Sequence, residues 1–220
     1  MKIVRRSVPE DHQLPGDLHP VVRRVLAARG IVAGNQLDHS LSQLLAFEQL
    51  SGIEAAVTLL SDAITNDKHI LFVADFDADG ATACAVGIRG LGALGARHLS
   101  YVVPNRFEYG YGLTPEIVDV ASQQQPHLIV TVDNGSSSVD GVARAKVKGI
   151  QVLITDHHLP GEQLPAADAM VNPNQPGDAF PSKSLAGVGV MFYTLLATRA
   201  YLREQSWFTE VGLAEPKLAE

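Results

Sequence analysis

Acidic side chains and two adjacent histidines follow directly on three apolar segments of this chain. The sequence Asp-Phe-Asp-Ala-Asp-Gly begins at residue 75, Asp-Asn-Gly begins at residue 133, and Asp-His-His begins at residue 156. Carboxylate oxygen and neutral imidazole nitrogen are both metal ligands, and this mixture suits Mn²⁺, with Mg²⁺ as the alternative. A sheet that brings the three segments side by side would therefore form a metal site.

The three acids of the first motif are Asp75, Asp77 and Asp79. We expect them on one side of an extended segment, because alternate side chains of a strand point the same way. Two carboxylates about 4 Å apart repel by roughly 4 kcal/mol at an effective dielectric of about 20, so the cluster calls for a cation. Whether Asp75 binds that ion directly stays open. The same pattern opens an EF-hand calcium loop, but Val86 stands at position twelve, where that loop needs a glutamate.

The second motif joins a strand to a helix and offers both a ligand and a phosphate contact. Asp133 lies at the strand end, where its carboxylate can face a metal ion. Asn134 and Ser136, with the free amides at the start of the helix, are candidate contacts for a substrate phosphate. Serine is also a good N-cap residue, so we expect the serines of this segment to cap the helix.

The third motif places an acid before two histidines. A neighbouring carboxylate fixes the tautomer of an imidazole, which gives Asp156 a supporting role behind the ligands. Adjacent side chains diverge, so His157 and His158 are not expected to bind the same ion. One should be a metal ligand, and the other should face the substrate as an acid or hydrogen-bond donor.

Two further candidates for substrate binding, Arg106 and Tyr111, follow the expected strand at 99–103. A guanidinium group can hold a phosphate through two hydrogen bonds. An aromatic ring in a glycine-flanked loop can stack on a base. Both residues therefore join the list of candidates on the same edge of the sheet.

Strands and helices alternate along the chain beyond residue 53. This alternation predicts an α/β fold, with a parallel sheet covered by helices on both faces. Right-handed crossovers bring the C-terminal ends of all parallel strands to one edge, where ligands bind in such folds. We expect strands at 70–75, 99–103, 128–133, 150–155 and 170–171, and helices at 20–28, 53–64, 80–95, 138–148, 187–204 and from Thr114 onward.

Composition limits the classes of function. The formal net charge is −7, whereas a protein that binds nucleic acid without sequence preference is normally basic, so part of any such surface lies elsewhere. No apolar run approaches the roughly 18 residues that span a bilayer, and the N-terminus is not a signal peptide. The single cysteine, Cys84, excludes an internal disulfide and favours the cytoplasm. The segment 215–220 is typical of the start of a helix, so we expect the chain to continue beyond it.

Together the three motifs resemble those of the DHH phosphoesterase superfamily, which is named after the third. The sequences Val-Val-Pro-Asn-Arg-Phe-Glu from residue 102 and Phe-Pro-Ser-Lys-Ser-Leu-Ala-Gly-Val-Gly-Val from residue 180 are similar to its bacterial single-strand-specific DNA exonucleases. The resemblance implies 5′→3′ hydrolysis of single-stranded DNA to 5′-mononucleotides in DNA repair and recombination, with two Mn²⁺ or Mg²⁺ ions. It implies single-stranded DNA with a 5′ end as the partner, leaves other DNA-repair proteins open as partners, and gives no role to a membrane.

Carried over position by position, the resemblance implies five metal ligands: Asp75, Asp77, Asp79, Asp133 and His157. Asp133 is expected to bridge two ions and to take part in catalysis, and His158 is expected to face the substrate as a catalytic residue. Ala74, Ser136 and Val139 depart from the pattern of the family without changing these ligands.

The resemblance also implies a domain organisation. A DHH phosphoesterase domain is expected over residues 49–220, preceded by a helical extension over 1–48. A fourth acidic motif, a second catalytic domain and a nucleic-acid-binding barrel are expected beyond residue 220, so this chain alone should be folded but nearly inactive. Two alternatives stay open: a receiver-like phosphoacceptor domain, and another DHH phosphodiesterase that acts on short oligonucleotides or cyclic dinucleotides.

Overall fold

The computed structural model describes residues 7–9, 12–38 and 40–218, and the chain divides into two compact units. The first unit ends at Leu45 and the second begins at Ala46. In the first unit, the helix α1 begins with a proline, whose fixed φ suits a first turn, and the ring of His19 accepts a hydrogen bond from the Val21 amide. Its helical elements are α1 (Pro20–Ala28), η1 (Gly34–Leu37) and η2 (Leu41–Gln43).

The second unit contains a five-stranded, all-parallel sheet with the strand order β2-β1-β3-β4-β5. Its strands are β1 (Ile70–Ala74), β2 (Leu99–Val102), β3 (Leu128–Val132), β4 (Gln151–Thr155) and β5 (Ala169–Val171). Every residue of β1 and β3 is buried, as expected for central strands of a parallel sheet with both faces covered. The predicted strands, including the short one near residue 170, are confirmed.

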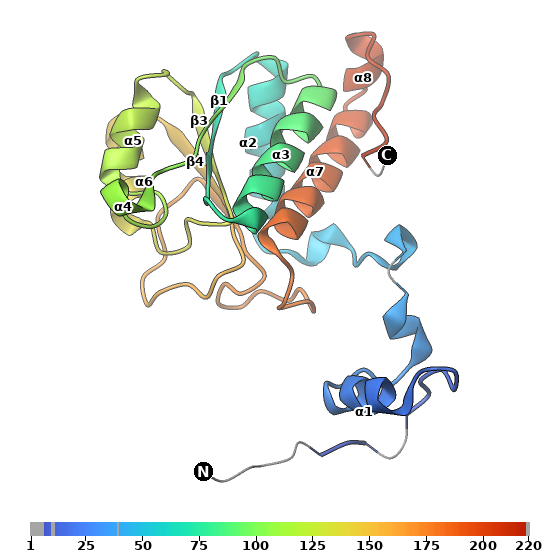
Figure 1. The fold of residues 1–220 in the computed structure, drawn as a ribbon. Helices are drawn as coiled ribbons and strands as arrows, with labels where there is room; N and C mark the ends of the chain where they lie inside the picture. The colour runs from blue at the N-terminus through green and yellow to red at the C-terminus, as the bar shows by residue number, and fades with distance from the viewer. Residues whose placement is uncertain (1–6, 10–11, 39, 219–220) are drawn as a thin grey trace. The chain divides into compact units, whose positions relative to one another are not determined.

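Helices cover both faces of this sheet, with α2, α3 and α7 on one side and α5 and α6 on the other (Figure 1). Alternate residues of β1 enter opposite cores: Phe72 packs into the first and Val73 into the second. A Cβ atom built at Gly87 of α3 would lie 2.5 Å from the Phe72 ring, so glycine lets that helix approach the strand closely. The helical elements are η3 (Phe47–Gln49), α2 (Ile53–Thr65), α3 (Ala78–Ala93), α4 (Arg106–Tyr109), α5 (Pro115–Ser122), α6 (Val139–Val147), α7 (Gly187–Glu204) and α8 (Trp207–Glu210).

The chain reverses direction across the sheet between β1 and β3. From β1 it crosses to β2 at one edge, and from β2 it returns to pair β3 with the other side of β1. A crevice at the C-terminal ends of the strands is expected at such a point. The acids that follow β1 and β3 therefore lie at the position where this class of fold binds ligands.

One predicted helix is wrong within the described residues. The segment 213–217 is irregular, and residue 218 lies in a turn. The Glu215 carboxylate lies 3.6 Å from both Arg199 and Arg203 of α7, and the Pro216 carbonyl accepts a hydrogen bond from Arg199. These contacts fix the irregular segment against α7. No described helix is long and apolar enough to cross a membrane.

Candidate metal centre

The three motifs lie side by side because the sheet ladder continues one residue past each strand. The Asp75 amide donates to the Val132 carbonyl at 3.3 Å, the Asp133 amide to the Thr155 carbonyl at 3.0 Å, and the Asp156 amide to the Val171 carbonyl at 3.1 Å. Each acid is therefore anchored on the last residue of the neighbouring strand. The topology alone brings the predicted site residues to one edge.

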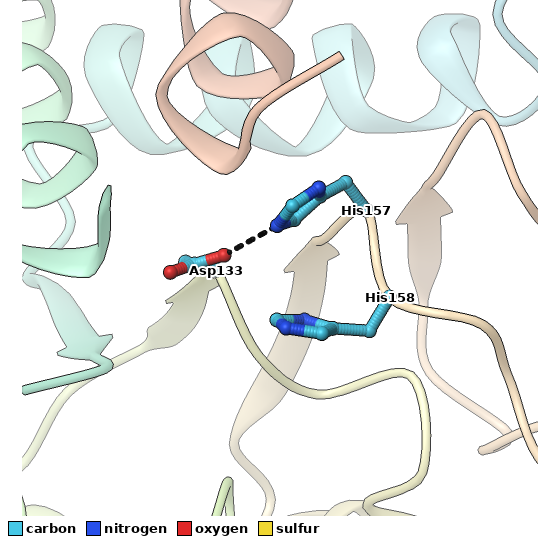
Figure 2. A group of neighbouring side chains, drawn as sticks. All are labelled: Asp133, His157 and His158. Carbon is cyan, nitrogen blue, oxygen red and sulfur yellow. Dashed lines mark ion pairs between the residues drawn. The ribbon is translucent and has the colours of Figure 1, made fainter. Parts of the chain in front are cut away.

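Asp133 is at the centre of the site. It is only 1% exposed, and its φ of 62° lies in the left-handed region. His157 Nε2 lies 3.0 Å from its Oδ1 atom (Figure 2), but no donor among the described residues is aligned to hydrogen-bond that oxygen. Burial, together with the carboxylates of Asp79 and Asp77, raises the pKa of Asp133 to about 7.

This buried, orphaned carboxylate oxygen is the observation that fits a metal ion. In the part of the chain that the structure describes, two groups of side chains have ligand atoms within 4.8 Å of one another, and both include Asp133. One group adds Asp75 and Asp77, and the other adds His157 and His158. A carboxylate shared between two groups of ligands can bridge two ions, and oxygen with imidazole suits Mn²⁺ or Mg²⁺.

The local structure of the first motif differs from the prediction. β1 ends at Ala74 and α3 begins at Ala78, so the three acids do not share one extended segment. Asp77 is instead the N-cap of α3, and its Oδ1 atom accepts hydrogen bonds from the Asp79 amide at 3.0 Å and the Gly80 amide at 3.1 Å. A helix that begins at the fourth position of the motif also excludes the twelve-residue calcium loop.

Asp79 links the acid cluster to the start of α7. Its two carboxylate oxygens accept hydrogen bonds from the Gly187 and Val188 amides, each at 2.8 Å, and Oδ2 lies 3.5 Å from His157 Nε2. Among the described residues, Asp79 belongs to neither group of converging ligands. An ionised carboxylate with two hydrogen bonds keeps further lone pairs, so direct binding of a metal by Asp79 stays a prediction.

Gly187 forms one wall of the site. A Cβ atom built there would lie 2.7 Å from Asp133 Oδ1, closer than real Cβ contacts allow. The start of α7 therefore approaches the central carboxylate in a way that only glycine permits, and its amides face negative charge. A side chain at this position would fill the space beside Asp133.

The two histidines do not diverge, so that expectation is wrong. Their ring centroids lie 4.6 Å apart, and both rings face Asp133 from the same loop (Figure 2). The loop after β4 turns instead of continuing the strand, because the Asp156 carboxylate accepts hydrogen bonds from the amides of both histidines. The division of roles between His157 and His158 stays a prediction.

Asp156 orients His158 as the sequence suggests. Its Oδ1 atom lies 2.8 Å from His158 Nδ1, which we assign as the protonated nitrogen, and Oδ2 accepts a hydrogen bond from the Ser136 amide at 2.9 Å. Burial alone would raise the pKa of Asp156, but these hydrogen bonds outweigh burial and lower it. Burial would likewise lower the pKa of His158, but the hydrogen bond and charge of Asp156 raise it.

Asn134 and Ser136, predicted to contact substrate, are each only 1% exposed. The Asn134 amide group donates to the Val73 carbonyl at 3.0 Å and the Val132 carbonyl at 2.9 Å, and so holds the ends of β1 and β3 together. The Ser136 hydroxyl pairs with Asn172 at 2.7 Å. These contacts give both side chains a structural role, and their substrate contact stays a prediction.

Two asparagines that the sequence analysis left out support the histidine loop. Asn172 donates to the His158 carbonyl at 2.9 Å, and Asn174 donates to the His157 carbonyl at 2.6 Å. Both follow β5 at the same edge of the sheet, so their position after a strand was the available signal.

The predicted capping of α6 by a serine is wrong. Ser138 occupies the N-cap position without a capping hydrogen bond, and its hydroxyl accepts a hydrogen bond from the Leu113 amide instead.

Tyr111 lies at the site, as predicted. Its hydroxyl donates to the Asp133 carbonyl at 3.3 Å and lies 3.3 Å from His158 Nδ1. Tyr111, Ser136 and His158 line one cavity of about 200 Å³ beside the metal ligands. Arg106 is the first residue of α4, but its side chain lies outside the described part of the structure.

Comparison with known proteins identifies the family. Residues 69–214, which contain all three motifs, match the DHH family, N-terminal domain. The chain belongs to the DHH family. This membership removes the receiver-domain alternative, and it agrees with the sheet and the strand-end acids described above.

Several relatives of the chain are named as exonucleases. The chain is 53% identical to the single-stranded-DNA-specific exonuclease RecJ of Salmonella typhimurium over 216 residues, which are 98% of this chain and 37% of that protein. It therefore spans little more than a third of the length of that relative. A structure of exonuclease RecJ bound to manganese matches with a TM-score of 0.64 and 34% identity, over 79% of this chain and 41% of that one. RecJ from Thermus thermophilus in complex with Mg²⁺ matches with a TM-score of 0.50 and 27% identity, over 87% of this chain and 21% of that one.

Proposed function

We propose that this chain is the metal-binding part of a single-strand-specific DNA exonuclease that releases 5′-mononucleotides from 5′ ends, in DNA repair and recombination. The observation that carries the proposal is the buried Asp133 carboxylate, which belongs to two groups of converging ligands. Its Oδ1 atom has His157 Nε2 at 3.0 Å but no aligned hydrogen-bond donor among the described residues. The names of the relatives support the substrate class. A DNA substrate also favours the cytoplasm as the location.

Asp75, Asp77 and Asp133 would hold one Mn²⁺ or Mg²⁺ ion, and Asp133 with His157 would hold a second. Bound in this way, the ions would supply a water of lowered pKa and neutralise charge on the phosphate. The protein contributes the fixed position of these ligands. Asp75 and Asp133 are anchored through their amides on neighbouring strands, and Asp77 is anchored as the cap of α3.

His158 is proposed to face the substrate. Asp156 holds the Nδ1 proton of its ring, so Nε2 is left to contact a phosphate oxygen or the leaving oxygen of the strand. Because Asp156 favours the charged imidazole, His158 can donate a proton to that oxygen as the bond breaks. Tyr111 covers this imidazole edge-on, with ring centroids 5.9 Å apart, and lines the same cavity.

We propose that the other functional parts of the enzyme correspond to the regions of its relatives that this chain does not match. We expect a fourth acidic motif, a second catalytic domain and a nucleic-acid-binding barrel there, by resemblance to the family. The net charge of −7 agrees with a basic DNA channel that lies elsewhere. The 220 residues alone should bind Mn²⁺ weakly and turn over little DNA.

The test compares this chain with one extended to the full length of its relatives. With Mn²⁺ and a 5′-phosphorylated single-stranded oligonucleotide, the extended chain should release mononucleotides, and Asp133→Asn should abolish that release. A matched duplex should be digested far more slowly. Equal digestion of duplex and single strand, or full activity of Asp133→Asn, would contradict the proposal.

A further inference from the structure

Phenylalanine is buried or half-buried in the described chain except at two positions. Phe72 and Phe180 are 0% exposed and Phe208 is 7% exposed, whereas Phe76 is 51% exposed and Phe107 is 95% exposed. A single exposed apolar side chain is ordinary on a protein surface. Two exposed phenyl rings on the same edge of the sheet as a cluster of metal ligands are less ordinary and favour a binding role.

Both rings belong to the loops that surround the metal centre. Phe76 lies between the ligand candidates Asp75 and Asp77, directly after β1. Phe107 lies in α4, which follows β2 at the same edge. The loop that contains α4 lies beside Asp75, because its Pro104 and Tyr111 line a small cavity together with that residue.

The backbone at each of these two exposed positions is hydrogen-bonded to a neighbouring side chain. The Phe76 amide donates to Asp75 Oδ1 at 2.7 Å, and the Phe107 amide donates to Asn105 Oδ1 at 3.1 Å. Tyr109, two residues after Phe107, packs against the core beneath the sheet, so the helical turn presents Phe107 on its opposite side. Tyr111, at 49% exposure, adds a third accessible ring.

We propose that Phe76 and Phe107 stack on bases of the nucleic-acid strand whose phosphate lies at the metal centre. This inference rests on the proposed function and adds the residues that hold the strand. The carboxylates beside Phe76 repel phosphate wherever no cation neutralises them, whereas the two rings can attract the bases of the strand. Every base has an apolar face, which makes such stacking tolerant of sequence.

Stacking on these rings also selects for single strands. Bases in a duplex already stack on their neighbours and pair across the helix, so their faces are not available to a protein ring. A base in a single strand can leave its neighbour and cover a phenyl ring. Phe76 and Phe107 therefore supply a physical reason for single-strand preference next to the reacting phosphate.

The first test uses the seven phenylalanines as separate reporters. The 220-residue chain is labelled with 4-fluorophenylalanine, and its ¹⁹F spectrum is recorded with Mg²⁺ while a single-stranded oligonucleotide is added. Phe76→Leu and Phe107→Leu assign the two resonances. We expect the signals of Phe76 and Phe107 to shift and those of Phe72 and Phe180 to stay. An oligonucleotide with abasic sites should shift neither ring, and absence of shifts with the normal strand would overturn the inference.

The second test measures the reaction in the chain extended to the length of its relatives. Phe76→Leu and Phe107→Leu should each raise the KM for single-stranded DNA about 5- to 150-fold, which corresponds to the loss of one stacked base. Mn²⁺ affinity should be unchanged, and the variants should lose nothing further on an abasic substrate. Tyr201→Leu, an exposed ring on α7, serves as the matched control and should behave as the parent chain.

The two tests separate this inference from the proposed function. Shifts at both rings in the 220-residue chain, with no hydrolysis by the extended chain, would support stacking and contradict the exonuclease proposal. Hydrolysis of single strands with an unchanged KM in both variants would support the exonuclease and overturn stacking. An equal loss on normal and abasic substrates would assign the rings a purely structural role, which also overturns the inference.

Discussion

Replacing Asp133 by asparagine should stabilise the metal-free protein, although it removes the central residue of the site. The carboxyl is buried, and burial with Asp79 and Asp77 raises its pKa from 3.8 to about 7. The folded state therefore binds this proton more tightly than the unfolded state, so stability falls as pH rises from 3.8 through 7. Asparagine carries no charge and tolerates the left-handed backbone at this position.

The size of the effect follows from the difference in pKa between the folded and unfolded states. Because of that difference, the free energy of unfolding is lower than at acidic pH. The loss is at most about 4 kcal/mol at pH 8 and about 2 kcal/mol at pH 5.5. Asp133→Asn should relieve most of this loss. The free energy of unfolding should therefore exceed that of the parent chain, and the excess should widen by about 2 kcal/mol between the two pH values.

Urea unfolding followed by circular dichroism in the presence of a chelator measures this difference. Asp119→Asn is the matched control, because Asp119 is a surface acid whose pKa is lowered by Lys148 and Arg144. Its loss should change stability little, because solvent screens an exposed ion pair. Saturating Mn²⁺ should reverse the order, since only the parent chain gains from the ion. A metal-free Asp133→Asn that is no more stable at pH 8 than the parent would show that the buried carboxylate does not destabilise the fold.

Three further outcomes are expected. His157→Ala should lower Mn²⁺ occupancy, whereas His158→Ala should keep the metal and lose turnover in the extended chain; elemental analysis and an exonuclease assay would show the opposite pattern if the roles are reversed. Gly187→Ala should weaken Mn²⁺ binding severalfold or more by calorimetry, because its Cβ atom would lie 2.7 Å from Asp133 Oδ1, and Gly161→Ala, with nothing within 4 Å, should bind as the parent does. The 220-residue chain should show a cooperative thermal transition yet negligible release of mononucleotides; rapid digestion of single strands by this chain would contradict the assignment of missing parts.

The sequence predicts which residues meet at the C-terminal edge of the sheet, because the topology determines their positions. Parallel strands must present their C-terminal ends together, so the positions of Asp75, Asp133 and Asp156 follow from the alternation of strands and helices. Local geometry is less predictable where two local preferences compete. Asp77 can continue a strand or cap a helix, and the cap prevails because two amides of α3 bond to its carboxylate.

Contacts between distant residues account for what the sequence could not give. The two hydrogen bonds between Asp79 and the start of α7 join residues more than one hundred positions apart, and no local sequence pattern predicts them. The histidines converge on Asp133 because Asp156 turns the loop and the two asparagines after β5 hold its carbonyls. A sequence pattern identifies the candidate ligands of such a site, but only the folded chain shows which of them converge on one point.

Anomalous diffraction from Mn²⁺-soaked crystals of this chain would show whether Asp133 is the centre of a metal site. We expect an anomalous peak in contact with the Asp133 carboxylate, with further ligands from Asp77 or Asp75 on one side and His157 on the other. A second, weaker peak that shares Asp133 would show the bridging arrangement. Manganese peaks elsewhere on the protein, with none in contact with Asp133 at saturating Mn²⁺, would exclude a metal site centred on this residue.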